Sequence, residues 1–476
     1  MQNEMNHIYR YRSIDKLFEY KELENLEIYF AKPDELNDQM EDYMNIVWQG
    51  DEIAFRGLFK HYLYTLSSVY YDTNFRNRKQ KIDIDYFPVF LASDINNKPE
   101  MQSTFKSIYH EFFNPIDIAN IPSEMALSNK KYSIDEILFI LKHLHPYAYL
   151  VIDSIFKKLD YGIDVFKDKE HKEIYEELKY SKQYSSLIKA TNSGEQAEKV
   201  DLICKFERER KLTKAILNNM HKDKDTYNIS ILNFDFPEIY LKNIKKILYN
   251  NFCVACFSNS YQNEPMWSNY ADCENGICLK YKIKTENNKK YLSLNSACND
   301  NPNEEIYKKF NNLEILNVNY SNEYPEINFF TSLGGLPKKI IEEFWLCNYD
   351  RTKFSTCLDY YKNHNEWYFN YHKKAREYIC TKSKNWEYEQ EQRIILRDLL
   401  YPAYENKEYR IANYDIRDLD AIIFGRKVST EDKRKVIEII NKHYSKSGTN
   451  VKFYDLYYST ITNKLELKPC GEYIYL

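Results

Sequence analysis

The stretch WEYEQEQRII, residues 386–395, is the most informative part of the sequence for the fold. Read as a β-strand, it places Glu387, Glu389 and Glu391 on one face, because side chains two apart on a strand point the same way. Like charges on one face repel each other, so the arrangement needs an explanation. Two explanations compete: a solvated edge strand, and a cleft whose chemistry requires carboxylates.

The segments around this stretch predict an α+β fold. Short apolar or alternating runs bounded by turn residues are typical of strands, and runs with a 3.6-residue period are typical of helices. Strands are expected within residues 7–13, 26–33, 251–258, 277–283, 419–425 and 450–459, and helices within 14–23, 263–272 and 429–444. Gly276, just beyond the second of these helices, is expected to end it in a left-handed conformation.

The part of the chain between residues 50 and 245 is mostly helical in pattern. It contains long amphipathic stretches such as 134–159 and 194–220. The predicted architecture is therefore a mixed, mostly antiparallel β core with flanking helices, interrupted by a large α-helical insertion. Its expected parts are the first part of the core at 1–49, the insertion at 50–245 and the second part of the core at 246–476.

The overall composition limits the functions that the chain could have. The 476 residues carry a formal net charge of −4, so sequence-independent nucleic-acid binding would need a local basic patch. No apolar run is long enough to span a membrane, and the N-terminal residues lack the apolar segment of a signal peptide. Ten cysteines in such a chain are expected to be reduced thiols. We therefore expect a cytoplasmic protein with no membrane partner.

Several catalytic motifs are absent from the sequence. It contains no G-x-x-x-x-G-K-[ST] or G-x-G-x-x-G phosphate loop, no G-x-S-x-G nucleophile elbow and no H-E-x-x-H zinc motif. Four cysteines between residues 253 and 278 have a spacing that invites comparison with a zinc site. A strand at 251–258 would, however, put Cys253 and Cys256 on opposite faces. We expect core thiols and no metal.

Three groups of polar and aromatic residues fall at predicted strand ends. Arg10 and Arg12 share one face of the first strand, just before a helix, where two guanidinium groups and free backbone N–H groups suit a phosphate. Taken alone, this pair is better explained as snorkelling arginines on an edge strand. Ser258, with Trp267 and Tyr270 one helical turn apart, forms the second group, for which a core aromatic pair is the simpler explanation. The glutamate stretch is the third.

Six short motifs together resemble a bacterial protein family, the domain-of-unknown-function family 2971. Its members carry Y-[KR]-Y-R-S or H-Y-T-S near the N-terminus, then L-N-D-P-x-E, C-F-S, M-W-x-x-Y-A, G-[IV]-C-[IL] and W-x-x-E-x-E-x-R. In this chain the motifs occur in the same order, as YRYRS (9–13), LNDQME (36–41), CFS (256–258), MWSNYA (266–271), GICL (276–279) and WEYEQEQR (386–393). The resemblance covers the α/β part of the chain and leaves 50–245 unexplained. Gln39 stands where the family has proline, which alters a turn.

This family pattern is similar in turn to the layout of ADP-ribosyltransferases. The resemblance implies NAD as co-substrate and Glu391 as the catalytic carboxylate, which would stabilise an oxocarbenium-like transition state at the ribose. Glu389 would orient the acceptor nucleophile. The nucleotide would be held by the other two groups, with Arg10 or Arg12 at the pyrophosphate and Ser258 with Trp267 or Tyr270 around the nicotinamide. This chemistry requires no metal.

The sequence is therefore compatible with three functions. The first is a cytosolic ADP-ribosyltransferase-like effector that modifies a protein or nucleic-acid acceptor, with a role in phage defence through abortive infection. The second is a ligand-binding module without turnover, whose helical insertion engages a protein partner. The third is a Mg²⁺-dependent nuclease using Asp38, Glu41 and Glu389, which lacks an acid-x-lysine arrangement and ranks last. A basic first strand combined with late glutamates favours the enzyme.

Overall fold

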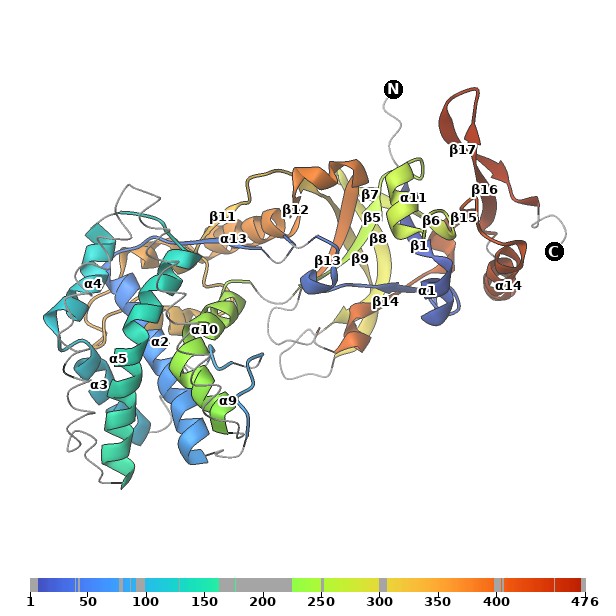
Figure 1. The fold of residues 1–476 in the computed structure, drawn as a ribbon. Helices are drawn as coiled ribbons and strands as arrows, with labels where there is room; N and C mark the ends of the chain where they lie inside the picture. The colour runs from blue at the N-terminus through green and yellow to red at the C-terminus, as the bar shows by residue number, and fades with distance from the viewer. Residues whose placement is uncertain are drawn as a thin grey trace. The chain divides into compact units, whose positions relative to one another are not determined.

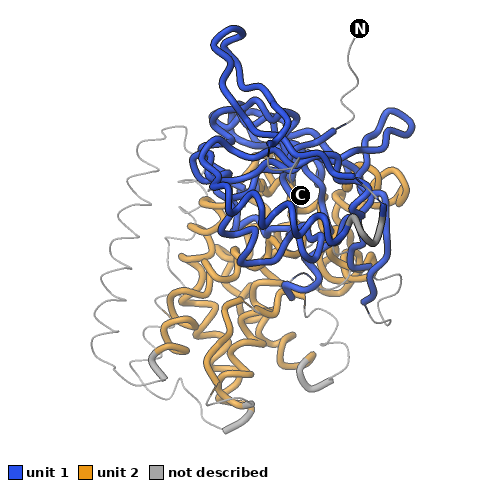
Figure 2. The backbone as a smooth tube through the Cα atoms, turned by 90° about the vertical axis from the view of Figure 1, so that its right-hand side faces the viewer, with its two compact units in different colours: residues 1–44, 250–325, 373–476 blue, residues 45–249, 326–372 orange. Residues whose placement is uncertain are grey.

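A computed structural model describes residues 7–38, 40–41, 43–76, 80–85, 87–90, 99–127, 129–161, 176, 225–249, 252–298, 306–397, 404, 406–448 and 450–471. These residues form an α+β structure with a large, mostly antiparallel sheet and a helical region, which confirms the predicted fold class (Figure 1). The predicted helix at 194–220 lies outside the described residues. Two compact units are present, unit 1 at 1–44, 250–325 and 373–476 and unit 2 at 45–249 and 326–372 (Figure 2).

Unit 1 is built on a sheet of twelve strands. The order along the sheet is β17–β16–β15–β6–β1–β5–β13–β9–β8–β14–β2, and β7 pairs with β8. Every pair is antiparallel except β15 with β16. The strands are β1 (His7–Ser13), β2 (Glu27–Tyr29), β5 (Phe252–Ser258), β6 (Gly276–Lys282), β7 (Lys284–Glu286), β8 (Lys289–Cys298), β9 (Tyr307–Asn317), β13 (Glu391–Arg397), β14 (Ile411–Tyr414), β15 (Leu419–Phe424), β16 (Lys452–Ser459) and β17 (Lys464–Pro469). The helices of this unit are α1 (Ile14–Glu19), α11 (Glu264–Tyr270) and α14 (Thr430–Ser447), and a separate parallel pair joins β10 (Asn319–Tyr320) to β12 (Thr381–Lys382).

Four strands that contain parts of the motifs, β6, β1, β5 and β13, are neighbours in this sheet. β1 pairs with β6 along its whole length and with β5 at Tyr9↔Ser258. On the other side of β5, β13 pairs from Glu391↔Ser258 to Arg397↔Phe252. Segments that are far apart in the sequence therefore meet at the ends of β5 and β13.

The two faces of the sheet pack against different helices. On one face α1 and α14 contribute to a large apolar core that includes Ile8 and Phe257. On the other face α11 packs Trp267 against Tyr11. Because side chains alternate along a strand, the even-numbered residues of β1 face the large core and the odd-numbered ones face α11.

Unit 2 is mainly helical. Its helices are α2 (Glu52–Tyr71), α3 (Pro99–Phe112), α4 (Ile116–Leu127), α5 (Ile134–Tyr161), α9 (Asp225–Ser230), α10 (Phe236–Ile244) and α12 (Lys338–Ile340), with a π-helical turn η9 (Ile341–Trp345). A small sheet has the order β11 (Glu326–Asn328), β3 (Asn45–Trp48), β4 (Tyr132–Ser133). The sequence places 326–372 in the second part of the core, whereas the structure groups it with the helical unit. The boundary at 372/373 falls inside helix α13 (His364–Ile379).

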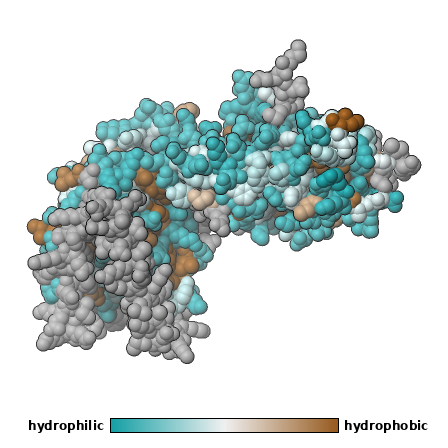
Figure 3. All heavy atoms as spheres, turned by 45° about the horizontal axis from the view of Figure 1, so that its top comes forward, coloured by the Kyte–Doolittle hydropathy of each residue, from teal (hydrophilic) through white to brown (hydrophobic). Residues whose placement is uncertain are grey.

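Figure 3 shows the hydropathy of one face of the protein. On the face drawn in Figure 3, hydrophilic residues predominate and apolar residues form small, separate patches. Among the helices that the structure describes, none is long and apolar enough to cross a membrane.

The stretch 386–395 does not form one strand. Lys384–Glu389 is a short 3-10 helix η11, Gln390 has a φ of 47° in the left-handed region, and β13 begins only at Glu391. The prediction that Glu387, Glu389 and Glu391 lie on one face of a single strand is therefore wrong. Two backbone N–H groups of this segment donate locally, that of Trp386 to the carbonyl oxygen of Ser383 at 3.0 Å and that of Gln390 to the carbonyl oxygen of Glu387 at 3.2 Å.

Gly276 is also placed differently from its prediction. The left-handed residues after α11 are Asp272, Cys273 and Glu274, with φ of 47°, 51° and 73°. Gly276 begins β6 instead, where a Cβ atom would lie 2.4 Å from the carbonyl oxygen of Arg12. The close approach of β1 and β6, and not a turn, requires glycine here.

Candidate functional site

A row of three side chains crosses the sheet where β5 ends and β13 begins. The register pairs Tyr9 with Ser258 and Ser258 with Glu391, and cross-strand partners point to the same face. This is the face on which α11 packs, since Tyr9 contacts Tyr261 there with ring centroids 5.8 Å apart. The second and third groups predicted from the sequence therefore meet.

Lys382 joins the two glutamates. Its Nζ lies 2.7 Å from Oε2 of Glu389 and 3.1 Å from Oε2 of Glu391. A third carboxylate, Glu41, lies 3.6 Å away. Lys382 belongs to β12, and the ring of Trp386 lies 4.8 Å from its Nζ. One buried ammonium group thus offsets the repulsion between carboxylates that the sequence suggests.

Arg393 contacts Glu391 from its own strand. Its Nε donates to Oε1 of Glu391 at 2.7 Å and its Nη2 to Oε2 at 3.1 Å, which makes a bidentate pair. The same guanidinium donates to both carboxylate oxygens of Glu41, with Nη1 to Oε2 at 2.8 Å. These contacts define a buried cluster, called here the glutamate network, which consists of Glu41, Lys382, Glu389, Glu391 and Arg393.

Tyr270 and Ser258 bind Glu389 from the α11 side. The hydroxyl of Tyr270 donates to Oε1 of Glu389 at 2.6 Å. Oγ of Ser258 donates to the backbone carbonyl oxygen of Glu389 at 3.0 Å. Glu389 and Glu391 are only 1% and 4% exposed, while Glu387 is exposed. Neither a solvated edge strand nor a row of unpaired acids describes this arrangement.

Trp267 is a core residue and does not reach the glutamates. It is fully buried, and its Nε1 donates to the carbonyl oxygen of Tyr261 at 2.7 Å. Its ring packs edge-on against Tyr11, with centroids 5.1 Å apart. Of the two aromatic residues predicted for the nicotinamide, Tyr270 is therefore the one in contact with the network.

The two glutamates differ in acidity because their charge partners differ. Burial acts to raise the pKa of Glu391, but Arg393 and Lys382 outweigh it and bring this pKa to about 2. In Glu389 burial prevails over the effects of Lys382 and Tyr270, so its pKa is raised. Burial acts to lower the pKa of Lys382, but Glu391 and Glu389 raise it overall. Neighbouring carboxyl groups with diverging pKa values are the arrangement that acid–base catalysis uses.

Arg10 and Arg12 face away from the glutamate network. They alternate with Tyr9 along β1 and therefore point to the opposite face of the sheet. Arg10 is buried, and its Nη2 donates to the carbonyl oxygen of Tyr29 at 3.2 Å, while its Nη1 has no hydrogen-bond partner in the described part of the chain. Nε of Arg12 donates to Glu22 at 2.9 Å. The first and third groups do not face one cleft.

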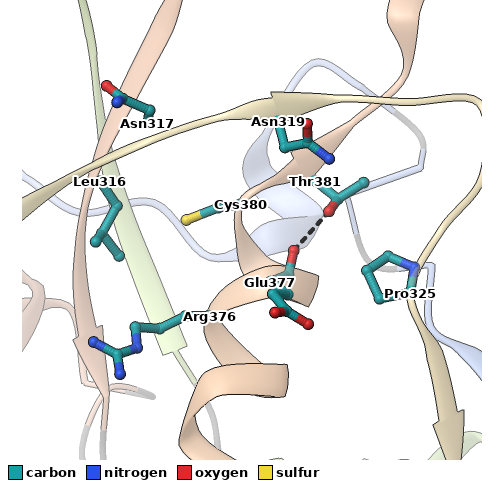
Figure 4. Close-up of a pocket in the computed structure, with 8 residues that line it drawn as sticks. All are labelled: Leu316, Asn317, Asn319, Pro325, Arg376, Glu377, Cys380 and Thr381. Atoms are coloured by element: carbon teal, nitrogen blue, oxygen red, sulfur yellow. Dashed lines mark hydrogen bonds between the residues drawn. The ribbon is translucent and has the colours of Figure 1, made fainter.

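A cavity of about 480 Å³ lies beside the glutamate network (Figure 4). Leu316, one of its lining residues, is the cross-strand partner of Arg393, and Thr381 directly precedes Lys382. The hydroxyl of Thr381 donates to the carbonyl oxygen of Glu377 at 2.6 Å. The lining residues are Leu316, Asn317, Asn319, Pro325, Arg376, Glu377, Cys380 and Thr381. The lining thus includes amide, guanidinium and carboxylate side chains, of which Asn317 also accepts from Gln392 at 2.8 Å and Arg376 also pairs with Glu314 at 3.6 Å.

The acids proposed for a nuclease are engaged within the protein. Glu41 accepts from Arg393 and Glu389 accepts from Lys382, while Oδ1 of Asp38 accepts from the backbone N–H of Met40 at 3.0 Å. In the ranges that the structure covers, no three His, Cys, Asp or Glu side chains are grouped to hold a metal ion. This geometry gives the nuclease prediction no support.

Lys382 and the Glu41–Arg393 pair could not be assigned to the site from the sequence. Lys382 lies in the polar run TKSKNWE (381–387), which has no distinguishing pattern. Glu41 is 352 positions from Arg393, and the only signal that links them is that each lies in one of the motifs quoted above. Comparisons with protein-family models, curated proteins and solved structures found no match to the chain. The family resemblance stays a prediction from the motifs.

Proposed function

We propose that the glutamate network is the active site of an ADP-ribosyltransferase-like enzyme that cleaves NAD and modifies a protein or nucleic-acid acceptor. One observation supports this most directly. Glu389 and Glu391 come together with Ser258 and Tyr270, which belong to separate sequence motifs, at the ends of two adjacent strands. Arg10 and Arg12 lie on the opposite face and are not part of this proposal.

The acidities of the two glutamates suit the reaction. Breaking the nicotinamide–ribose bond leaves positive charge on the ribose while the electron pair departs with nicotinamide. Glu391, with its lowered pKa, is ionised and would stabilise that charge, which is typically worth about 3 to 4 kcal/mol. Glu389, with its raised pKa, would take a proton from the acceptor nucleophile. Because both carboxylates are paired with Lys382, NAD binding requires this flexible side chain to move away from them.

The experiment is mass spectrometry of purified protein incubated with NAD and cell lysate. Wild type and Glu387→Gln should release nicotinamide and add the mass of one ADP-ribose to an acceptor. Glu391→Gln should be slower by a factor of about 100 or more. Glu387→Gln is the matched control because this side chain is exposed. Intact NAD with the wild-type protein would contradict the proposal even if the Glu391 variant failed to fold.

The second candidate is a ligand-binding module without turnover. The pairing of every carboxylate in the glutamate network favours it, as does the cavity lined by Asn317, Asn319 and Arg376. Calorimetric titration with NAD distinguishes the two functions. Binding with NAD recovered intact supports the module, and binding followed by nicotinamide release supports the enzyme. A role in phage defence and a protein partner for the helical region stay predictions from the sequence.

A further inference from the structure

Lys60 and Cys347 form a buried amine–thiol pair in unit 2. Lys60 lies on α2, and Cys347 follows the turn η9 by two residues. Nζ of Lys60 is 4.0 Å from Sγ of Cys347 and donates to the carbonyl oxygen of the same residue at 3.3 Å. Both side chains are almost completely buried. A nitrogen and a sulfur that can form a bond once the sulfur is oxidised are therefore held together away from bulk water.

The ammonium group of Lys60 has no acidic partner among the residues that the structure describes. No carboxylate in the described ranges forms an ion pair with it, and its other neighbour is the ring of Phe344, 4.7 Å from Nζ. Burial lowers the pKa of Lys60 to about 8, and the cation Arg351 acts in the same direction. A lysine in this state readily loses its proton, and the neutral amine has the lone pair that a nucleophile needs.

The backbone fixes the geometry of this pair. Gly57, almost one helical turn before Lys60, packs so closely on η9 that a Cβ atom would lie 2.0 Å from the carbonyl oxygen of Trp345. The ring of His61 stacks on that of Trp345 with centroids 4.2 Å apart. Helix α2 thus contacts Trp345, the last residue of η9, from positions before and after Lys60, and Cys347 follows Trp345 by two residues.

We propose that Lys60 and Cys347 are a site of reversible oxidative cross-linking, in which a peroxide produces a sulfur–nitrogen bond between them. The peroxide oxidises the Cys347 thiol to a sulfenic acid, and hydrogen peroxide is itself reduced to water. The lone pair of the neutral Lys60 amine then attacks the sulfur, the S–N bond forms and the S–O bond breaks. Hydroxide leaves and takes a proton from the nitrogen, which gives a second water. This inference is independent of the function proposed for unit 1.

Burial determines which oxidation product is expected. Cys273 is exposed, so its sulfenic acid meets water and more peroxide and can proceed to the sulfinic acid. The sulfenic acid of Cys347 would instead meet the Lys60 amine before further oxidant enters, because both groups are shielded. Burial also raises the pKa of the Cys347 thiol, so its first oxidation should be slower than that of Cys273.

The test is peptide mass spectrometry of the full chain after treatment with hydrogen peroxide and alkylation of the remaining thiols. The expected result is a peptide containing Lys60 joined to one containing Cys347, with a mass two hydrogens below the sum of the two. Dithiothreitol should separate them. If Cys347 stays unmodified, or becomes a sulfinic acid without any joined peptide, under conditions that oxidise Cys273, the proposal is overturned.

Variants locate the reacting atoms. Lys60→Arg keeps a cation at this position but lacks a nucleophilic amine, so the joined peptide should be lost while Cys347 still becomes oxidised. Cys273→Ser removes an exposed thiol and should leave the cross-link unchanged. A joined peptide that persists in Lys60→Arg would contradict the assignment. The wild-type measurement decides the proposal on its own if the arginine variant does not fold.

Discussion

Two buried lysines, one in each unit, have opposite electrostatic surroundings. Lys382 and Lys60 are each 5% exposed. Lys382 has three carboxylates within 3.6 Å, and its pKa is raised. The neighbours of Lys60 among the described residues are a carbonyl oxygen, a thiol and an aromatic ring, and its pKa is lowered to about 8. Burial is the same in both places. The partners therefore decide whether a buried lysine is a permanent charge or a reactive amine.

The largest expected effect comes from replacing Lys382 by methionine, and Lys60→Met is the comparison. Lys382→Met leaves Glu389 without a cation, and breaking a buried ion pair in this way typically costs about 3 to 5 kcal/mol. Lys60→Met removes a cation that has no acidic partner in the described part of unit 2, so the free energy of unfolding of this unit should stay the same or rise by about 1 kcal/mol. Hydrogen exchange in increasing urea reports β13 and α2 separately. Equal losses of stability in Lys382→Met and Lys60→Met would contradict this prediction.

Acid should weaken unit 1 through Glu391. The pKa of this group is 4.5 in the unfolded chain and about 2 in the folded protein. Its stabilising contribution is therefore complete above pH 4.5 and disappears as the pH falls towards 2, a change of about 3 kcal/mol. Acid-unfolding curves of Glu391→Gln, followed by circular dichroism, should lack this loss of stability between pH 4.5 and pH 2. The curve of the exposed Glu387→Gln variant should match that of wild type.

Alkali should strengthen unit 2 through Lys60 by a comparable amount. The pKa of Lys60 falls from 10.5 to about 8 on folding, so the unfolded chain holds more protons between these two pH values. The free energy of unfolding should rise across this window, by about 3 kcal/mol at most. Hydrogen exchange of α2 in urea at pH 7.5 and pH 10, compared with Lys60→Met, measures the effect. A rise of the same size in the methionine variant would assign it to another group.

The smallest effect is expected at the edge of the glutamate network. Tyr270→Phe removes the donor to Glu389 and should lower the free energy of unfolding of unit 1 by about 1.5 kcal/mol. Tyr388→Phe is the control, because the hydroxyl of Tyr388 only accepts a longer bond, 3.3 Å, from Asn269. Urea unfolding of the two variants side by side tests this difference. Equal stabilities would mean that the Tyr270 hydrogen bond adds nothing to the network.

Local sequence patterns predicted the fold class because most strands and helices here have clear periodicity. The segment before Glu391 was predicted wrongly because its alternating pattern is also compatible with a 3-10 helix, and the sequence does not show whether its backbone N–H groups donate locally or across a sheet. The role of Gly276 could not be predicted either. The group that leaves no room for a Cβ atom there is the carbonyl oxygen of Arg12, a residue more than 260 positions earlier.

Only part of the glutamate network could be predicted, because local sequence patterns do not show which segments become neighbours. Glu389, Glu391, Ser258 and Tyr270 could be grouped from their motifs, and the structure brings them together. The face to which Arg10 points could not be assigned relative to them, because a shift of one residue in register moves a side chain to the other face. Lys382 could not be chosen either, since a lone lysine in a polar run has no local signature.

The central position of β1 also affects how the chain folds as it is synthesised. β1 ends at Ser13, whereas its neighbours β5 and β6 begin at Phe252 and Gly276. At about 5 to 20 residues per second, the ribosome needs on the order of 10 to 50 s to supply both partners. During that time both edges of β1 expose unpaired backbone groups that can pair with another chain. Truncated chains released before residue 276 should therefore depend on a chaperone to stay dispersed, and chains released after residue 282, where β6 is complete, should depend on it less.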